Sequence, residues 1–274
     1  MSKSYLRNVS LLKQSKDFLK YRLSSETKYD IHSPFVFGLL TEVINDKKNY
    51  PAYNKVEALR QKLLKDDTLI TVTDLGAGSK KNNSTQRKVK DICRNAEKNK
   101  KYGQLLFRLT KHFNPSLIFD LGTSLGVTTL YLSEAAPSAG IISIEGCPQT
   151  ASIAQKNFDE AHARNIQLVN ANFDDALESL LEENHKPRTT NHKLFFFDGN
   201  HRKKPTLQYF HQCLRFCGNN DVMIFDDIHW SEEMEEAWTA IKKHERVTVT
   251  IDLFFLGIVF FRKEQAKQDF VLRF

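Results

Sequence analysis

The sequence predicts a doubly wound α/β fold in the C-terminal three-fifths of the chain, with a mostly parallel seven-stranded sheet and an antiparallel C-terminal hairpin. From Ser116 onward, short apolar runs alternate with longer helical patterns, which is typical of βαβ units. The glycine-containing sequence DLGTSLG follows the first apolar run. Only a few residues join the last two runs, which permits a hairpin and excludes a parallel crossover.

The expected elements follow one another in regular order. The five parallel strands are Leu117–Leu121, Ile141–Glu145, Ile166–Val169, Lys193–Asp198 and Val222–Asp226, and the hairpin strands are Val247–Asp252 and Leu256–Arg262. The helices between them are Gly126–Ala135, Pro148–Ala163, Asp175–Glu183, Pro205–Phe216 and Ser231–His244. Pro148 suits a first helical turn, and Ser231 is a good N-cap, which supports two of these helix starts.

Bulk composition indicates a globular protein. The chain has 274 residues, of which 41% are hydrophobic and 27% charged, so it can bury a sizeable core. No apolar run approaches the roughly 20 residues of a membrane helix, and the first 20 residues lack the features of a signal peptide. Its four cysteines show neither metal spacing nor a C-x-x-C pair. We therefore expect a cytoplasmic protein with reduced cysteines.

Charge divides the chain into two parts. Residues 1–110 hold 23 Lys and Arg against 11 Asp and Glu, whereas residues 111–274 hold 17 against 22. We expect a basic, mainly helical N-terminal region with one strand-turn at 1–101, which could cap the substrate, and a second domain at 102–274. The basic region suits nucleic acid or an acidic small molecule, or it is simply a solvated surface.

The segment DLGTSLG carries the most specific pattern. Asp120 ends the first strand, and Gly122 and Gly126 follow it at a spacing of four. Glycine is needed where the backbone turns sharply and lets a ligand approach closely. Glu145 ends the second strand 25 residues after Asp120, close to where an acid can accept both ribose hydroxyls of a nucleotide-like ligand.

These motifs resemble those of the class I S-adenosylmethionine-dependent methyltransferases. The resemblance covers residues 102–262 and includes Asn172 and Phe173, which follow the third strand where this family contacts adenine. It implies a set of residues that bind S-adenosylmethionine. The set is Asp120, Gly122, Thr123, Ser124, Gly126, Glu145, Gly146, Asn172, Phe173 and Asp198.

The glycine motifs allow two alternative interpretations, another class of enzyme and another cofactor loop. A dinucleotide-binding oxidoreductase would have G-x-G-x-x-G after the first strand, but Ser124 stands where its middle glycine would be. The sequence TVTDLGAGS at 71–79 also looks like a first motif, but no strand that ends in an acid follows at the expected distance. We interpret Asp74–Ser79 as a turn that is structural or faces the active site.

Within the family, residues 102–133 look most like the small-molecule O-methyltransferases. The closest overall resemblance is to a bacterial branch of uncharacterised methyltransferases, with HSPF at His32–Phe35 and DDIHW at Asp226–Trp230. The resemblance implies transfer of a methyl group from S-adenosylmethionine to a hydroxyl group. Its acceptor would be a small molecule, and the basic N-terminal region suits an acidic one.

A metal site is left open by the carboxylates at two strand ends. In catechol-type members of the family, an acid after strand four and an Asp-Asn pair after strand five hold a divalent cation, and here Asp198, Asp226 and Asp227 occupy those places. Three oxygen ligands suit Mg²⁺. Asp227 replaces the family's Asn, however, and these residues could instead bind the cofactor or cap a helix.

Catalytic candidates lie on the same loops. Asp198 would prepare the acceptor, and His201 or His229 could accept its proton, with Tyr102 and Trp230 shaping the pocket. Two other functions remain open: a nucleic-acid methyltransferase that uses the basic region, and a cofactor-binding module without activity. A homodimer is also left open.

Overall fold

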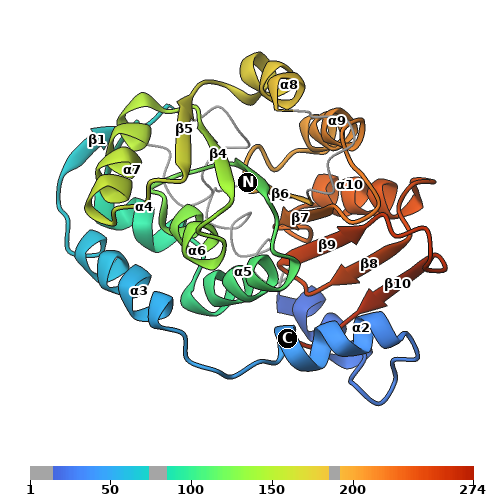
Figure 1. Cartoon of the computed structure of the whole chain (residues 1–274). Helices are drawn as coiled ribbons and strands as arrows, with labels where there is room; N and C mark the ends of the chain where they lie inside the picture. Colours follow the sequence, from blue (N-terminus) through green and yellow to red (C-terminus); the bar gives the residue numbers. More distant parts are fainter. Residues whose placement is uncertain (1–14, 74–84, 185–191) are drawn as a thin grey trace, which may run out of the picture.

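The main sheet has eight strands in the order β10-β8-β9-β7-β6-β3-β4-β5 (Figure 1). The computed structural model describes residues 15–73, 85–184 and 192–274. Its strands are β3 Leu117–Leu121, β4 Gly140–Glu145, β5 Ile166–Asn170, β6 Lys193–Phe197, β7 Val222–Asp226, β8 Val249–Asp252, β9 Leu256–Phe260 and β10 Gln268–Val271. Strands β5, β4, β3, β6 and β7 are parallel, and β9 is antiparallel to both β7 and β8. The predicted fold class, including the hairpin, is confirmed.

The sequence-based count of seven strands falls one short, because β10 pairs with β8 at the edge of the sheet. This strand is only four residues long, and its sequence QDFV has one buried residue. A short polar edge strand has no alternating pattern to detect. The first described helix, at residues 15–24, packs against the C-terminal segment. The Tyr21 hydroxyl on this helix donates to the carbonyl of Leu272 at 2.5 Å.

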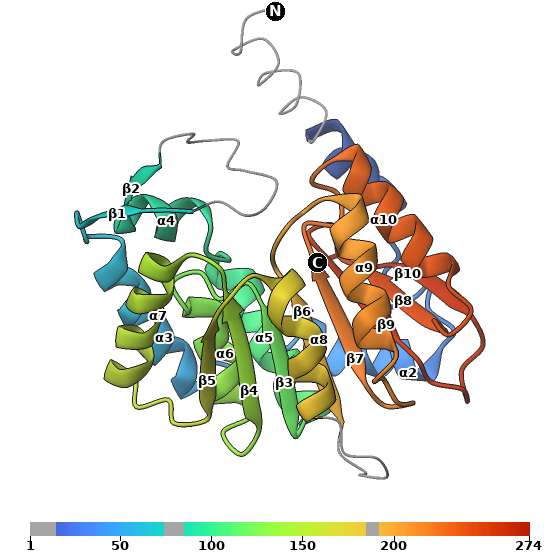
Figure 2. The same cartoon turned by 90° about the horizontal axis from the view of Figure 1, so that it is seen from above.

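Helices cover both faces of the sheet (Figure 2). They are α5 Lys100–Phe113, α6 Val127–Ala135, α7 Pro148–Glu160, α8 Phe173–Glu183, α9 Lys203–Leu214 and α10 Glu232–Lys243. Apolar residues of α8, α9 and α10 share one buried cluster with β3, β6 and β7. Those of α5 and α6 share another cluster with the alternate residues of the same strands. The result is a three-layer α/β/α arrangement.

The N-terminal region packs onto the layer formed by α5 and α6. It contains α2 Pro34–Gly38, the π-helix η1 Leu39–Ile44, α3 Pro51–Leu63, β1 Leu69–Thr71, β2 Gln86–Lys88 and α4 Val89–Asn95. Buried Arg108 on α5 donates to the carbonyls of Val43 at 2.7 Å and Ile44 at 3.0 Å, which caps the end of η1. Helices before residue 101 therefore share buried contacts with the sheet-bearing part, and the division at this residue stays a prediction.

The HSPF segment lies against β9. Ser33 caps α2, and the Phe35 ring packs edge-to-face on Phe260 with 5.0 Å between centroids.

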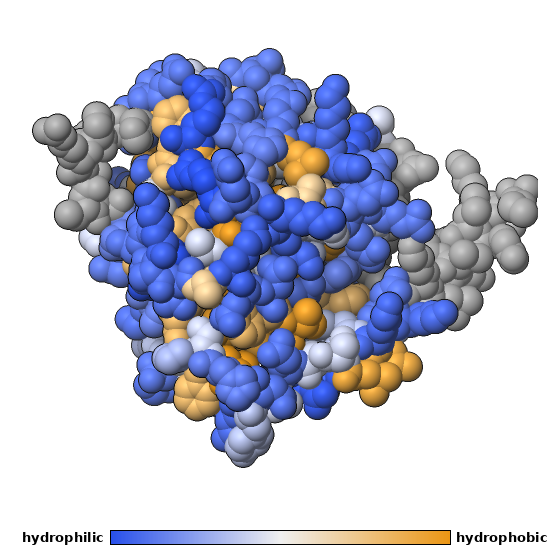
Figure 3. All heavy atoms as spheres, turned by 90° about the vertical axis from the view of Figure 1, so that its right-hand side faces the viewer, coloured by the Kyte–Doolittle hydropathy of each residue, from blue (hydrophilic) through white to orange (hydrophobic). Residues whose placement is uncertain are grey.

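The face of the molecule on the right of Figure 1 is mostly hydrophilic, with small hydrophobic areas (Figure 3). Within the described ranges, no helix combines the length and apolar character needed to cross a bilayer.

Candidate active site

Four strand ends bring the predicted site residues into one row. Residue pairing places Leu121 opposite both Ile144 and Phe197, and Phe197 opposite Phe225. The next residues along the strands are therefore neighbours at the carboxyl edge of the sheet, and they are Gly122, Glu145, Asp198 and Asp226. Strand β4 lies on one side of β3 and β6 on the other, so the row crosses the switch point where open α/β sheets bind ligands.

The loop between β3 and α6 depends on glycine. Gly122 has φ +118° and Gly126 has φ +84°. A Cβ on Gly122 would lie 2.1 Å from the backbone carbonyl oxygen of Asp198. Any side chain at this position would therefore push the ends of β3 and β6 apart, which explains why a glycine stands there.

Asp120 supports this loop from below. It is fully buried, and its Oδ2 accepts hydrogen bonds from Thr129 at 2.6 Å and Ser143 at 2.7 Å. The Thr123 hydroxyl also bonds to that of Ser143, at 2.6 Å. Burial raises the pKa of Asp120 to about 6, although the two hydroxyls oppose the shift. Asp120 and Thr123 thus lie where they hold the loop in shape.

Glu145 is tied to the loop by its carboxylate. Its Oε2 accepts from the backbone N–H of Ser124 at 2.8 Å, and its Oε1 accepts from that of Cys147 at 2.9 Å, with Gly146 between. Burial raises the pKa of this carboxyl, and the backbone donors act against the rise. Each carboxylate oxygen keeps a further lone pair for a ligand hydroxyl.

The segment after β5 lies against the segment after β6. Asn172 caps α8 through a bond from the N–H of Asp174 at 3.4 Å, and Phe173 begins the helix. The Phe173 ring is so close to Gly199 that a Cβ there would lie 2.7 Å from it. Phe173, one of the two residues predicted to contact adenine, therefore lies against the residue that follows Asp198.

The ends of β6 and β7 form an acidic cluster. Single ligand atoms of Asp198, His201 and Asp226 all lie within 4.8 Å of one another. The ammonium of Lys98 makes an ion pair with Asp226 and lies 3.6 Å from Oδ1 of Asp198. Burial raises the pKa of Asp198, with Lys98 as the main opposing influence. Among the described residues, Asp227, which has φ +53°, is not part of this group. His201 takes the position in the cluster that was predicted for Asp227.

His229 makes its contacts outside the cluster of Asp198, His201 and Asp226. Its Nε2 is 2.8 Å from Oδ2 of Asp252, and its ring stacks on Phe254. Burial acts to lower the pKa of His229, but the hydrogen bond and charge of Asp252 outweigh it, so the pKa is raised. Tyr102 is also engaged on this side, since its hydroxyl donates to the carbonyl of Leu253 at 3.4 Å. Of the two candidate histidines, the structure brings His201 to Asp198.

Two residues of the site were missed by sequence reasoning, Glu97 and Lys98. They lie in the linker between α4 and α5, and the Glu97 carboxylate accepts from the backbone N–H of Leu125 at 2.7 Å. Both stand in the charged run RNAEKNKK, which looks like solvated surface. No periodicity marks them, and their partners are 28 or more residues away in sequence. The turn predicted at Asp74–Ser79 lies outside the described residues.

The Glu97 carboxyl should make the free energy of unfolding depend on pH. Burial raises the pKa of its carboxyl from 4.5 to about 7, although Leu125 and Ser124 donate hydrogen bonds to it. Between these two pH values the folded chain holds a proton that the unfolded chain releases, so this group lowers stability as pH rises. Glu97→Gln cannot ionise. It should match the wild type near pH 4.5 and exceed its free energy of unfolding by about 3 kcal/mol above pH 7. Urea unfolding across this range measures the difference, and a pH-independent difference would contradict the prediction.

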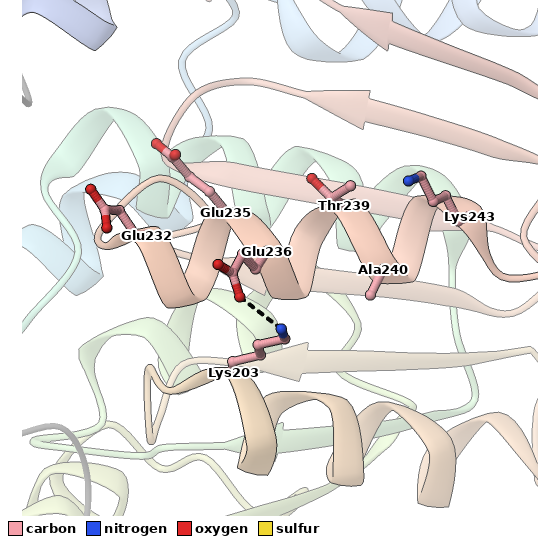
Figure 4. A pocket seen from close by; sticks show the side chains of 7 residues that line it. All are labelled: Lys203, Glu232, Glu235, Glu236, Thr239, Ala240 and Lys243. Atoms are coloured by element: carbon pink, nitrogen blue, oxygen red, sulfur yellow. Dashed lines mark hydrogen bonds and ion pairs between the residues drawn. The ribbon is translucent and has the colours of Figure 1, made fainter.

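A surface hollow of about 570 Å³ lies elsewhere, on the outer side of α10 (Figure 4). Lys203 lines it together with six residues of α10, and this lysine forms an ion pair with Glu236 at 2.7 Å. None of the lining residues belongs to a motif at the strand ends. The hollow is therefore not part of the candidate site.

The chain matches known methyltransferases. Residues 119–228 match a family model described as a methyltransferase domain. Over 130 residues the chain is 32% identical to a catechol O-methyltransferase of Niastella koreensis, a match that covers 47% of this chain and 55% of that protein. Among solved structures, it resembles the S-adenosylhomocysteine-bound methyltransferase PaMTH1 of Podospora anserina (TM-score 0.58, 10% identity, 85% of this chain and 98% of that one). It also resembles the O-methyltransferase TomG of Streptomyces achromogenes, in complex with S-adenosylmethionine (TM-score 0.54, 15% identity, 81% and 95%).

The resemblance to class I S-adenosylmethionine-dependent methyltransferases is confirmed by these matches. The family model covers the strand ends of β3, β4, β6 and β7, where the motifs lie. The likeness to the two solved structures supports the fold alone, because their sequence identities are low. The chain spans about half the length of the Niastella relative, so its activity and substrate do not follow from this match.

Proposed function

We propose that this chain transfers a methyl group from S-adenosylmethionine to a hydroxyl oxygen of a small molecule. The observation that carries the proposal is the row of strand ends in which Glu145 binds the glycine loop and Asp198 faces Asp226 with His201 beside it. The similarity to a catechol O-methyltransferase supports oxygen as the acceptor atom.

Glu145 fits the ribose of S-adenosylmethionine. Both of its carboxylate oxygens are anchored by backbone N–H groups but keep a lone pair, and burial makes bonds from two ribose hydroxyls strong. The loop also binds carboxylates readily, since the N–H groups of Ser124 and Leu125 already donate to glutamate side chains. Asn172 and Phe173 would bound the adenine, and Gly122 and Gly126 would let the methionine part approach.

Methyl transfer places few demands on covalent chemistry. The acceptor oxygen forms a bond to the methyl carbon while the carbon–sulfur bond breaks, and the hydroxyl releases its proton. Alignment of donor and acceptor can account for several kcal/mol, on the order of 7 or more in favourable cases. In this proposal His201, whose Nε2 lies 3.8 Å from Asp198, accepts the proton.

Mg²⁺ does not enter this proposal. The two carboxylates that would ligate it already face the ammonium of Lys98, so the donor set is not free for a divalent cation. An acidic acceptor, a homodimer and a cytoplasmic location stay predictions. In the described part of the basic region, Lys55, Lys62, Lys88 and Lys90 are paired with acidic side chains, which lowers the charge that these four offer to a nucleic acid.

Two measurements test the function. We expect S-adenosylmethionine and S-adenosylhomocysteine to bind in a calorimeter, as methyl donor and product must. With labelled S-adenosylmethionine and cell extract, label should appear in a small-molecule fraction that resists ribonuclease and protease. Binding without any transfer would leave a cofactor-binding module, and label in RNA would favour the nucleic-acid alternative. Absence of cofactor binding would refute the proposal.

A further inference from the structure

Lys98 occupies the position between the two carboxylates at the ends of β6 and β7. Its ammonium pairs with Asp226 and lies 3.6 Å from Asp198, so one cation serves both acids. These are the same two carboxylates that, with His201, could hold a metal ion. The side chain therefore stands where a cation would stand.

The burial of this group makes the pairing strong. The side chains of Lys98, Asp198 and Asp226 are 14%, 13% and 0% exposed. A carboxylate removed from water is very costly unless an opposite charge lies beside it. Because Asp226 has no exposed surface, it needs a cation that the protein or a ligand supplies, and Lys98 is that cation here.

The linker holds Lys98 in place from both sides. On one side, Glu97 is bound to the backbone N–H of Leu125 at 2.7 Å. On the other, the Asn99 side chain caps α5 by accepting from the N–H of Tyr102 at 3.2 Å. The residues before and after Lys98 are thus anchored to different elements. Because both neighbours are fixed, the backbone directs the Lys98 ammonium toward the two acids.

A divalent cation would compete for the same oxygens. Mg²⁺ requires ligand oxygens at about 2.1 Å, and a lysine ammonium at hydrogen-bond distance from one of those oxygens excludes it by space and by charge repulsion. A metal could enter only if Lys98 withdrew from both carboxylates. Metal binding would then be weaker by the free energy needed to break the contacts of Lys98 with the two carboxylates.

We propose that Lys98 is the resident cation of the Asp198–Asp226 pair and takes the place of a divalent metal in orienting the acceptor. The role of Lys98 in orienting the acceptor rests on the proposed function, whereas its assignment as the cation rests on the geometry alone. An ammonium has three N–H donors. The nitrogen lies beside Asp226 and 3.6 Å from Asp198, which leaves a donor for the acceptor oxygen that directs this oxygen toward the methyl group. The proton balance of methyl transfer is unchanged, because Lys98 keeps its protons.

Mn²⁺ binding tests this assignment without cofactor or acceptor. Electron paramagnetic resonance of Mn²⁺ would be recorded with the wild type, Lys98→Met, Lys98→Arg and Lys100→Met. Lys100→Met is the matched control, since it removes an exposed lysine two residues away. We expect Lys98→Met to bind one Mn²⁺ at least about tenfold more tightly than the other three proteins. Mn²⁺ should also raise the melting temperature of Lys98→Met alone.

Each result has a definite meaning. Wild-type chain that binds Mn²⁺ as tightly as Lys98→Met would overturn the proposal, as would folded Lys98→Met with no gain in Mn²⁺ affinity. If Lys98→Met does not fold without metal, the wild-type titration still decides whether the site accepts Mn²⁺, and recovery of folded protein on adding Mn²⁺ would support the assignment. Failure of the proposed function would appear as loss of cofactor binding in the wild type, a separate measurement from Mn²⁺ binding.

Discussion

Gly122→Ala should abolish cofactor binding and destabilise the protein. The new Cβ would lie 2.1 Å from the carbonyl oxygen of Asp198, and the backbone at φ +118° is unfavourable for alanine. The three atoms nearest to the new Cβ belong to the backbone of Asp198 and Gly199, so none can rotate away as a side chain would. The combined strain should lower the free energy of unfolding by about 3 kcal/mol, and the shifted loop should no longer accept the ligand. Thermal melting and calorimetric titration with S-adenosylhomocysteine measure the two effects.

Gly38→Ala provides the matched control for this substitution. Gly38 lies in α2 with φ −59°, and a Cβ there would meet nothing within 4 Å. Alanine in a helix should leave stability unchanged or raise it by up to about 1 kcal/mol, with no effect on ligand affinity. The role assigned to Gly122 is wrong if its alanine variant melts and binds ligand as Gly38→Ala does.

The strand ends could be predicted because they follow from spacing alone. Apolar runs identify the strands, and parallel strands place their carboxyl ends at one edge, so Gly122, Glu145 and Asp198 had to be neighbours. The left-handed backbone at Gly122 and Gly126 was likewise implied by the glycines themselves. What spacing cannot supply is the direction of each side chain, and Asp120 accordingly proved to lie beneath the loop.

The linker residues could not be predicted for a different reason. The contact of Lys98 with Asp226 joins positions 128 residues apart, and it depends on how α4 and α5 pack beside the sheet. In the sequence, Glu97 and Lys98 are indistinguishable from the other charged residues of a basic region. Only the tertiary structure separates a lysine that is 14% exposed between two carboxylates from a solvated one.

Glu145→Ala should weaken binding of S-adenosylmethionine and S-adenosylhomocysteine to the same degree, because both carry the ribose. The substitution removes a partly buried carboxylate that accepts from two hydroxyl groups, each bond contributing about 1.5 to 3 kcal/mol. It also leaves the N–H groups of Ser124 and Cys147 without their acceptor, which loosens the loop. We expect an affinity loss of about 100-fold or more, measured by calorimetry with each ligand.

A ligand analogue separates the ribose contact from the effect on the loop. S-adenosylhomocysteine that lacks both ribose hydroxyls should bind the wild type much more weakly than the parent ligand, whereas Glu145→Ala should hardly distinguish the two. The difference of the two losses is the coupling energy between the carboxylate and the hydroxyls, free of the loop's own contribution. Glu160→Ala, which removes an exposed partner of Lys62, serves as the neutral control. A coupling energy near zero would mean that Glu145 supports the loop but does not bind the ribose.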